Sequence, residues 1–144
     1  MPVLSVMEDK MIFEIIIGAI LLTLALIDFE KKEVPILLIL VLAVACVSFR
    51  LILGTSLSSI SYGISIGGCL IAIAIITKEK IGLGDGLVVT SLGFFLGASK
   101  TIWMLFWASL IMTLVSVILL LMKKRKLGST LPFMPAIFLG FLLV

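Results

Sequence analysis

The sequence contains no histidine, and it has only two cysteines. Without histidine, the Ser-His-Asp and Cys-His arrangements of nucleophilic catalysis and the usual imidazole ligands of zinc are excluded. Cys46 and Cys69 both lie in apolar runs without the spacing of metal ligands, so we expect neither a metal site nor a redox role for them. Any catalysis must therefore depend on Asp, Glu, Lys, Ser, Thr or Tyr.

Charged residues are also scarce. They make up 13% of the chain, whereas 62% of its residues are hydrophobic, and soluble domains have about a quarter charged and about half apolar residues. This composition predicts a membrane protein that has the lipid bilayer as its surroundings. The net charge of +3 is not gathered with aromatic residues into a basic surface, so we expect no nucleic acid as a partner.

Apolar runs bounded by charged residues predict six membrane-spanning segments. These are residues 11–27, 35–53, 59–77, 86–99, 101–122 and 131–144. The fourth and sixth would measure only about 21 Å as helices, which is short of a hydrocarbon core of about 30 Å. Because no repeat or linker interrupts the chain, we expect an all-α, polytopic membrane helix bundle of about six transmembrane helices, forming one domain over residues 1–144.

Basic residues favour one side of this predicted bundle. Most of them fall in the loops 28–34, 78–85 and 123–130, as Lys31, Lys32, Lys78, Lys80, Lys123, Lys124, Arg125 and Lys126. The opposite side has only Lys10, Arg50 and Lys100. Because cytoplasmic loops are enriched in Lys and Arg, the three loops are expected in the cytoplasm and both termini outside.

Two aspartates stand out because acidic groups near lipid are costly and usually mark a site or a pair. Asp28 ends the first segment, and Asp85 opens the fourth on the same predicted side. Asp85 would suit a helix N-cap, but Asp28 would meet the negative end of its own helix dipole. Capping therefore leaves Asp28 unexplained, whereas a carboxyl pair that shares a proton and activates water explains both.

Glycines surround the second aspartate and recur in the apolar segments. Gly82, Gly84 and Gly86 would let backbone and an extended substrate approach Asp85 closely. Two pairs lie four residues apart, Gly63 with Gly67 and Gly93 with Gly97, and small residues at that spacing favour tight packing of helices in lipid.

Three motifs in order resemble the type IV prepilin peptidases, a family of GxGD membrane aspartyl proteases. The first, "IDFEKKEVP", provides Asp28, Val34 and Pro35; the second, "GLGDGLVVTSLGFFLG", spans residues 82–97; the third, "KKRKLGSTLPFMPA", contains Pro132 and Pro135. The resemblance implies that Asp28 and Asp85 are catalytic and that no metal or other cofactor takes part. Ile36, Leu87 and Met134 differ from the residues that are usual in the family.

The resemblance also implies a substrate and a location. It predicts an endopeptidase of the plasma membrane that removes the basic leader of prepilin-like precursors (pilins, pseudopilins or archaellins) at the cytoplasmic face. Glu30, Glu33 and Glu79 are candidates for attracting that leader. Only ten residues precede the first segment and CxxC pairs are absent, so we expect no N-methyltransferase activity.

Two alternatives remain open from the sequence. A small transporter subunit could use the same two aspartates to carry an ion or relay protons. A presenilin-like protease would share the GxGD motif but would usually contain Pro-Ala-Leu, where this chain has Pro135, Ala136 and Ile137.

Overall fold

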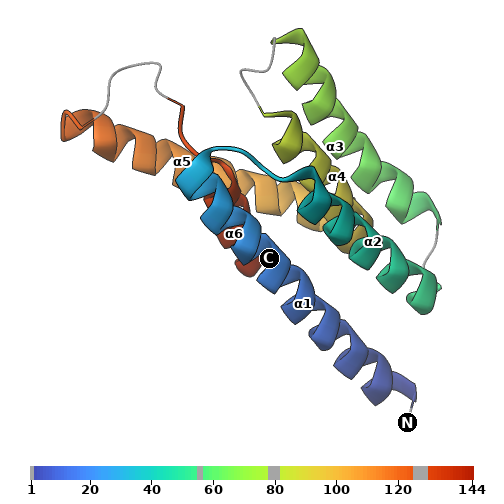
Figure 1. The fold of residues 1–144 in the computed structure, drawn as a ribbon. Coiled ribbons are helices and arrows are strands. Elements are labelled where there is room, and N and C mark those ends of the chain that lie inside the picture. Colours follow the sequence, from blue (N-terminus) through green and yellow to red (C-terminus); the bar gives the residue numbers. More distant parts are fainter. Residues whose placement is uncertain (1, 55–56, 78–81, 125–129) are drawn as a thin grey trace.

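The computed structural model describes residues 2–54, 57–77, 82–124 and 130–144, and these residues form helices joined by turns and short loops (Figure 1). The helices are α1 (Pro2–Lys31), α2 (Ile36–Leu53), α3 (Leu57–Ile76), α4 (Leu83–Leu96), α5 (Ala98–Leu121) and α6 (Met134–Leu142). The prediction of an all-α fold with about six helices is therefore confirmed.

Three helical stretches are long and apolar enough to cross a membrane: Val3–Lys31, Ile36–Leu53 and Ala98–Leu121. Ser61–Ile76 and Leu83–Leu96 are apolar but shorter. Many of the large apolar side chains on these helices are exposed, which is the arrangement expected where lipid rather than water covers the surface. The chain is a membrane protein, and the side faced by its termini remains a prediction.

The chain reverses direction so that distant motifs meet. Figure 1 shows α2 returning beside α1, and α3 then leading back to the end of the bundle at which α1 finished. Helix α4 begins at that end, and the segment that enters α6 lies there as well. The end of α1 and the start of α4 are thereby brought to one level of the bundle.

Helices α3 and α4 pack with their backbones in contact. A Cβ atom added to Gly63 would overlap the carbonyl of Gly93, and one added to Gly93 would overlap the carbonyl of Gly63. One turn further, a Cβ on Gly67 would lie 2.6 Å from the backbone nitrogen of Thr90. The prediction that these glycines allow close helix packing is confirmed for Gly63, Gly67 and Gly93.

Gly97 has a different role from the one predicted, because it ends α4 and separates it from α5. Its φ of 79° is in the region that side chains disfavour, so the helix stops there. The guanidinium of Arg50 donates hydrogen bonds to the carbonyl oxygens of Phe94 and, at 3.0 Å, Phe95. A cation at a helix C-terminus stabilises the free carbonyls of the last turn, so α2 caps α4.

The first helix extends beyond the predicted segment in both directions, from Pro2 to Lys31. Lys32 has a φ of 53° and donates its backbone N–H to the carbonyl of Asp28 at 2.9 Å, which ends α1. By contrast, α6 has only 9 residues and begins after Pro132. The predicted limits of segments one and six were therefore wrong by several residues.

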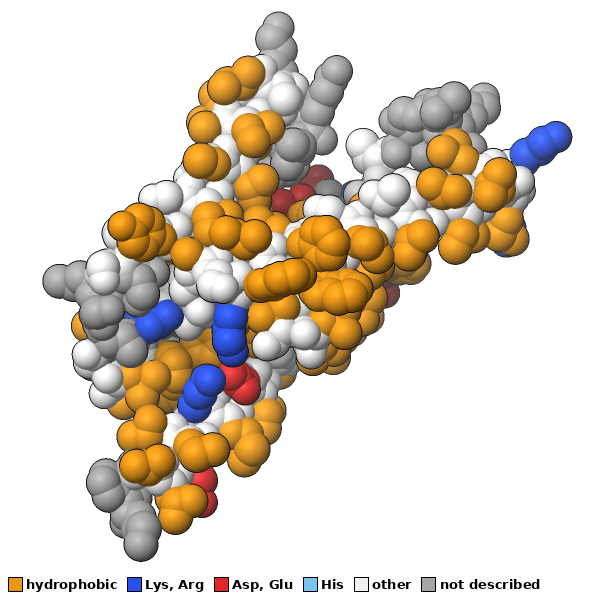
Figure 2. Space-filling view, turned by 180° about the vertical axis from the view of Figure 1, so that it is seen from behind, with side chains coloured by type: hydrophobic (Ala, Val, Ile, Leu, Met, Phe, Trp, Pro, Cys, Tyr) orange, Lys and Arg blue, Asp and Glu red, His pale blue; other side chains and the backbone are white. Residues whose placement is uncertain are grey.

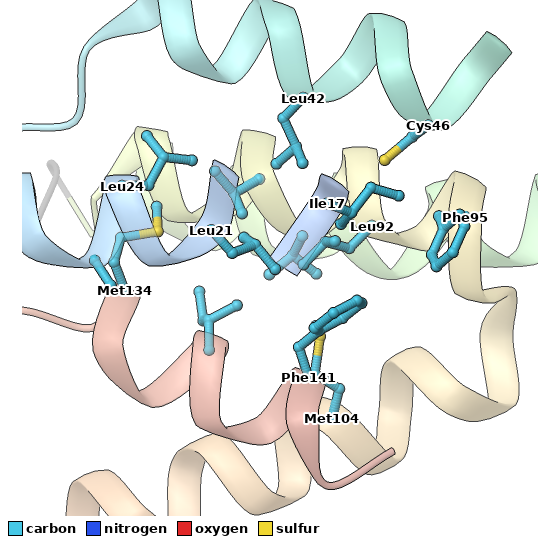
Figure 3. Close-up of a cluster of buried hydrophobic side chains, with 14 of the residues drawn as sticks. Ile17, Leu21, Leu24, Leu42, Cys46, Leu92, Phe95, Met104, Met134 and Phe141 are labelled. Atoms are coloured by element: carbon cyan, nitrogen blue, oxygen red, sulfur yellow. The ribbon is translucent and has the colours of Figure 1, made fainter. Parts of the chain in front are cut away.

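The core lies where α1, α2, α4, α5 and α6 meet, and Figure 3 shows side chains from these five helices directed toward one centre. They include Ile17, Leu21, Leu24, Leu42, Cys46, Leu92, Phe95, Met104, Met134 and Phe141. This packing fixes α6 against α1, and it thereby fixes the segment that precedes α6 beside the last turn of α1.

Candidate active site

Asp28 lies in the last turn of α1, and its side chain is buried, with 6% exposed. Its Oδ2 accepts a hydrogen bond of 3.1 Å from the backbone N–H of Met134, and the backbone of Phe133 also interacts with this carboxyl. Met134 is the first residue of α6, where backbone N–H groups have no partner inside their own helix. The N-terminus of α6 therefore compensates for the unfavourable position of Asp28 at the C-terminus of α1.

Asp85 lies in the first turn of α4 but is not its N-cap. Gly82 occupies the cap position and accepts the backbone N–H of Asp85 at 3.1 Å. Asp85 is therefore not the N-cap that its position suggested, and Asp28, whose place at the end of α1 does not suit capping of that helix, has a partner from α6 instead. Asp28 binds the start of another helix, whereas Asp85 points its half-buried side chain into a cavity.

The glycines of the GxGD motif allow two close contacts. A Cβ on Gly84 would lie 3.2 Å from the Cβ of Val34, and a Cβ on Gly86 would lie 2.7 Å from the Cγ1 of Ile71. The first turn of α4 thus fits between α3 and the segment that links α1 to α2. The Val-Pro pair of the first motif and the glycines of the second are in contact through Val34 and Gly84.

A cavity of about 600 Å³ brings the two carboxyl groups together. Its wall is formed by Asp28, Lys32, Val34, Leu70, Gly82, Gly84, Asp85, Ser109, Met112, Thr130, Leu131, Pro132 and Phe133. The two aspartates are near enough for their charges to interact. Figure 2 shows acidic side chains in the recess between the two arms of the molecule that contain α3 and α5.

The other residues singled out in the motifs differ in whether they line the cavity. Pro132 lines the cavity, Pro35 is the N-cap of α2 and Pro135 is in the first turn of α6. Glu30 and Glu33 are exposed and are not part of the cavity wall. Glu79 lies outside the described residues, as do Lys78, Lys80, Arg125 and Lys126 of the basic loops.

Several residues of the cavity wall were not found from the sequence. Lys32 could have been found, because it follows Asp28 by one helical turn. Ser109 and Met112 of α5 carry no such signal, since each is one side chain in a long apolar run. Their position depends on how α5 crosses the bundle, which the pattern of residues does not determine.

A second cavity, of about 420 Å³, lies between α1 and α6 at the other end of α6. Its wall is mainly apolar and includes Gly18, Ala19 and Phe141, with Glu14 and Lys100 as charged members. Neither Asp28 nor Asp85 contributes to it. The chemistry suggested by the sequence belongs to the larger cavity.

Comparison with known proteins gave one match. The model of the type IV leader peptidase family matches residues 15–117, which include both aspartates and end before the segment that holds Asp28 in place. Searches of curated proteins and of solved structures found no match. The matched region covers more than half of the chain and contains the paired carboxyl groups described above. The chain belongs to the type IV leader peptidase family and is a membrane peptidase.

Proposed function

We propose that the protein is an aspartic endopeptidase of the plasma membrane that removes the basic leader from prepilin-like precursors. The main support is the single cavity that contains the two motif aspartates, Asp28 and Asp85, which are 57 positions apart in the sequence. Family membership favours peptide hydrolysis over ion or proton transport by the same residues.

In the proposed mechanism the two carboxyl groups share one proton, because two like charges at short range are disfavoured. The ionised carboxylate takes a proton from water as the water oxygen bonds to the peptide carbonyl carbon. The protonated carboxyl keeps its proton and donates a hydrogen bond to the carbonyl oxygen, which polarises the carbonyl group. When the C–N bond breaks, the leaving amine takes a proton from the carboxyl that received one from water, and both groups return to their starting state.

The cavity also supports an extended substrate. Gly82 lines the cavity, and a Cβ atom added to it would lie 3.3 Å from Oδ2 of Asp85. The absence of a side chain at Gly82 therefore lets a peptide backbone approach that carboxyl. We place the apolar helix of the precursor in the bilayer, its leader in the cytoplasm and the cleaved bond at the level of the two aspartates. This reaction requires no metal or other cofactor, and we propose peptidase activity without N-methylation.

The leader would bind through acidic side chains beside the cavity. Glu30 and Glu33 are exposed in the last turn of α1 and the segment after it, and Glu79 is the third candidate. Exposed ion pairs are weak, about 0–1 kcal/mol each, so single substitutions should have small effects. Processing that is unchanged after all three are replaced by Gln would remove this part of the proposal.

The test is co-expression with a prepilin-like precursor, followed by detection of the shortened product. We expect cleavage by the native chain and none by Asp28→Asn or Asp85→Asn. Asp9→Asn is the matched control, because it makes the same change on α1 at an exposed position outside the cavity wall. Cleavage that survives either aspartate substitution would contradict the paired mechanism.

A further inference from the structure

Helix α5 forms part of the wall of the cavity that contains the two aspartates. Ser109 and Met112 are its two contributions, and the Ser109 side chain is exposed. Ser109 lies near the middle of α5, a helix of 24 residues that is long enough to cross a membrane. Polar groups at such a position are normally satisfied within the protein, because lipid offers them no hydrogen bonds.

Most other hydroxyl groups on the described helices are satisfied by their own backbone, although those of Ser99 and Ser116, outside the cavity wall, make no such bond. The hydroxyls that donate to the carbonyl four residues earlier belong to Thr23, Ser48, Ser65, Thr77, Thr90, Ser91, Thr101 and Thr113. The hydroxyl of Ser109 makes no such bond and has no hydrogen-bond partner in the described part of the chain. It is therefore available to a molecule in the cavity.

The other polar side chains of the cavity wall are less suited to donate a neutral hydrogen bond to a molecule in the cavity. Asp28 and Asp85 are the reacting acids, Lys32 carries a charge at the end of α1, and Thr130 already has an interaction. Ser109 is the neutral donor of this wall whose hydroxyl has no partner. It lines the same cavity as the two carboxyl groups but belongs to a different helix, since these are on α1 and α4.

We propose that Ser109 contacts the substrate and that its hydroxyl group donates a hydrogen bond to the carbonyl oxygen of the peptide bond that is cleaved. This inference rests on the proposed function, since it assigns a third group to the same reaction. Negative charge develops on that oxygen when water adds, and a fixed donor on the far side of the peptide stabilises it. The peptide would then be held between a hydroxyl on α5 and the acids on α1 and α4.

The first test compares Ser109→Ala with Ser116→Ala in the cleavage assay. Ser116 lies two turns further along α5, is half-buried and is not part of the cavity wall. We expect Ser109→Ala to lower kcat by about 10- to 100-fold, in or just below the range for loss of one oxyanion donor. Ser109→Thr should retain more activity than Ser109→Ala, and Ser116→Ala should match the native enzyme. Equal activity of Ser109→Ala and the native enzyme would overturn the proposal, as would an equal loss in Ser116→Ala.

A second measurement separates failure of this inference from failure of the proposed function. In a Cys69→Ala background, the rate of alkylation of Ser109→Cys is measured in the presence and absence of a prepilin-like peptide. Cys69 is replaced because it is exposed, whereas Cys46 is buried and can remain. Protection by the peptide supports the contact at residue 109 even if the native chain cleaves nothing, in which case only the proposed hydrolysis fails. Absence of protection by a peptide that the enzyme does cleave would overturn the contact while the proposed function stands.

Discussion

At the scale of single residues, Asp28 combines two tasks. Its carboxyl lines the cavity with Asp85, and it also accepts the first N–H of α6. A substitution that removes both tasks cannot distinguish chemistry from structure. Asparagine preserves an oxygen that can accept the N–H of Met134 but cannot take a proton in this reaction, whereas alanine removes the acceptor as well.

We therefore predict different results for Asp28→Asn and Asp28→Ala. In both variants the rate of cleavage should fall by at least about 1,000-fold, which is the scale seen when a catalytic group is removed. Only Asp28→Ala should also lose stability, by about 1–3 kcal/mol, because it leaves a buried N–H without an acceptor. Thermal unfolding in detergent measures this difference, and equal melting temperatures would show that the contact with α6 contributes little.

The acid pair also predicts how activity depends on pH. Cleavage should fall at low pH, where both carboxyls are protonated, and at high pH, where both are ionised, which gives a bell-shaped profile of kcat/KM. The control Asp9→Asn should leave both the acidic and the alkaline limb of the profile in place. A profile that rises to a plateau, with no fall at high pH, would show that the protonated partner is not required.

Much of the site could be predicted at this scale, and the limit has a physical cause. Asp28 and Asp85 were found because carboxyl groups near lipid need an explanation and because they lie in recognisable motifs. The donor at Met134 and the hydroxyl of Ser109 were not found, because only the packing of α6 and α5 brings the first to Asp28 and the second to the cavity wall.

At the scale of elements, the contact between α3 and α4 depends on the absence of side chains. Gly63 lies directly against the backbone of Gly93, whereas Gly68, in the same helix, has open space where a Cβ would be added. We predict that Gly63→Ala destabilises the protein by about 1–3 kcal/mol, as overpacking does. Gly68→Ala should be neutral or stabilising by up to about 1 kcal/mol, because alanine favours helix.

These two variants make a matched pair for thermal unfolding in detergent. If Gly63→Ala melts at the same temperature as Gly68→Ala, the two helices do not pack as closely as described. Because α4 carries Asp85, Gly63→Ala should also reduce cleavage, even though Gly63 is not part of the cavity wall.

The junction of α4 and α5 gives a second prediction at this scale. Arg50→Met removes the guanidinium that binds the carbonyls of Phe94 and Phe95, and each hydrogen bond to a charged group contributes about 1.5–3 kcal/mol. We expect Arg50→Met to lower the melting temperature clearly. Lys100→Met should change it little, because the side chain of Lys100 is exposed. Equal effects of the two would show that Arg50 acts only as a surface charge.

The sequence predicted the number of helices better than their limits. Apolar runs marked all six, since burial in lipid or protein imposes the same composition. Gly97 was expected to pack helices together, but its positive φ ends α4. Arg50 of α2 binds the carbonyls of the turn before Gly97, and the sequence does not show that contact.

At the scale of the whole molecule, helix lengths differ widely. Helix α1 has 30 residues and α4 has 14, which correspond to about 45 Å and about 21 Å. A bilayer core of about 30 Å matches neither length, so we expect lipid to thin beside α4 or water to reach its ends. Thin lipid beside Asp85 would help water to enter the cavity.

The orientation of the molecule can be tested by labelling with a reagent that does not cross membranes. In a Cys69→Ala background, we predict that Glu33→Cys reacts only in inverted vesicles and that Leu4→Cys reacts in intact cells, because basic loops face the cytoplasm. Both positions are exposed. Reaction of Glu33→Cys in intact cells would reverse the proposed orientation and place the cavity on the other side.

The hydrogen bond between Asp28 and Met134 joins residues 106 positions apart, and this separation sets the order of events during biosynthesis. At about 5–20 residues per second, Asp28 leaves the ribosome roughly 5–20 seconds before Met134 does. In the later part of that interval, after Asp85 has also left the ribosome, a growing chain contains both acids but has no α6 to hold the first of them. Peptidase activity should therefore switch on only after the last helix has been inserted, which would spare nearby nascent proteins from an incompletely assembled protease.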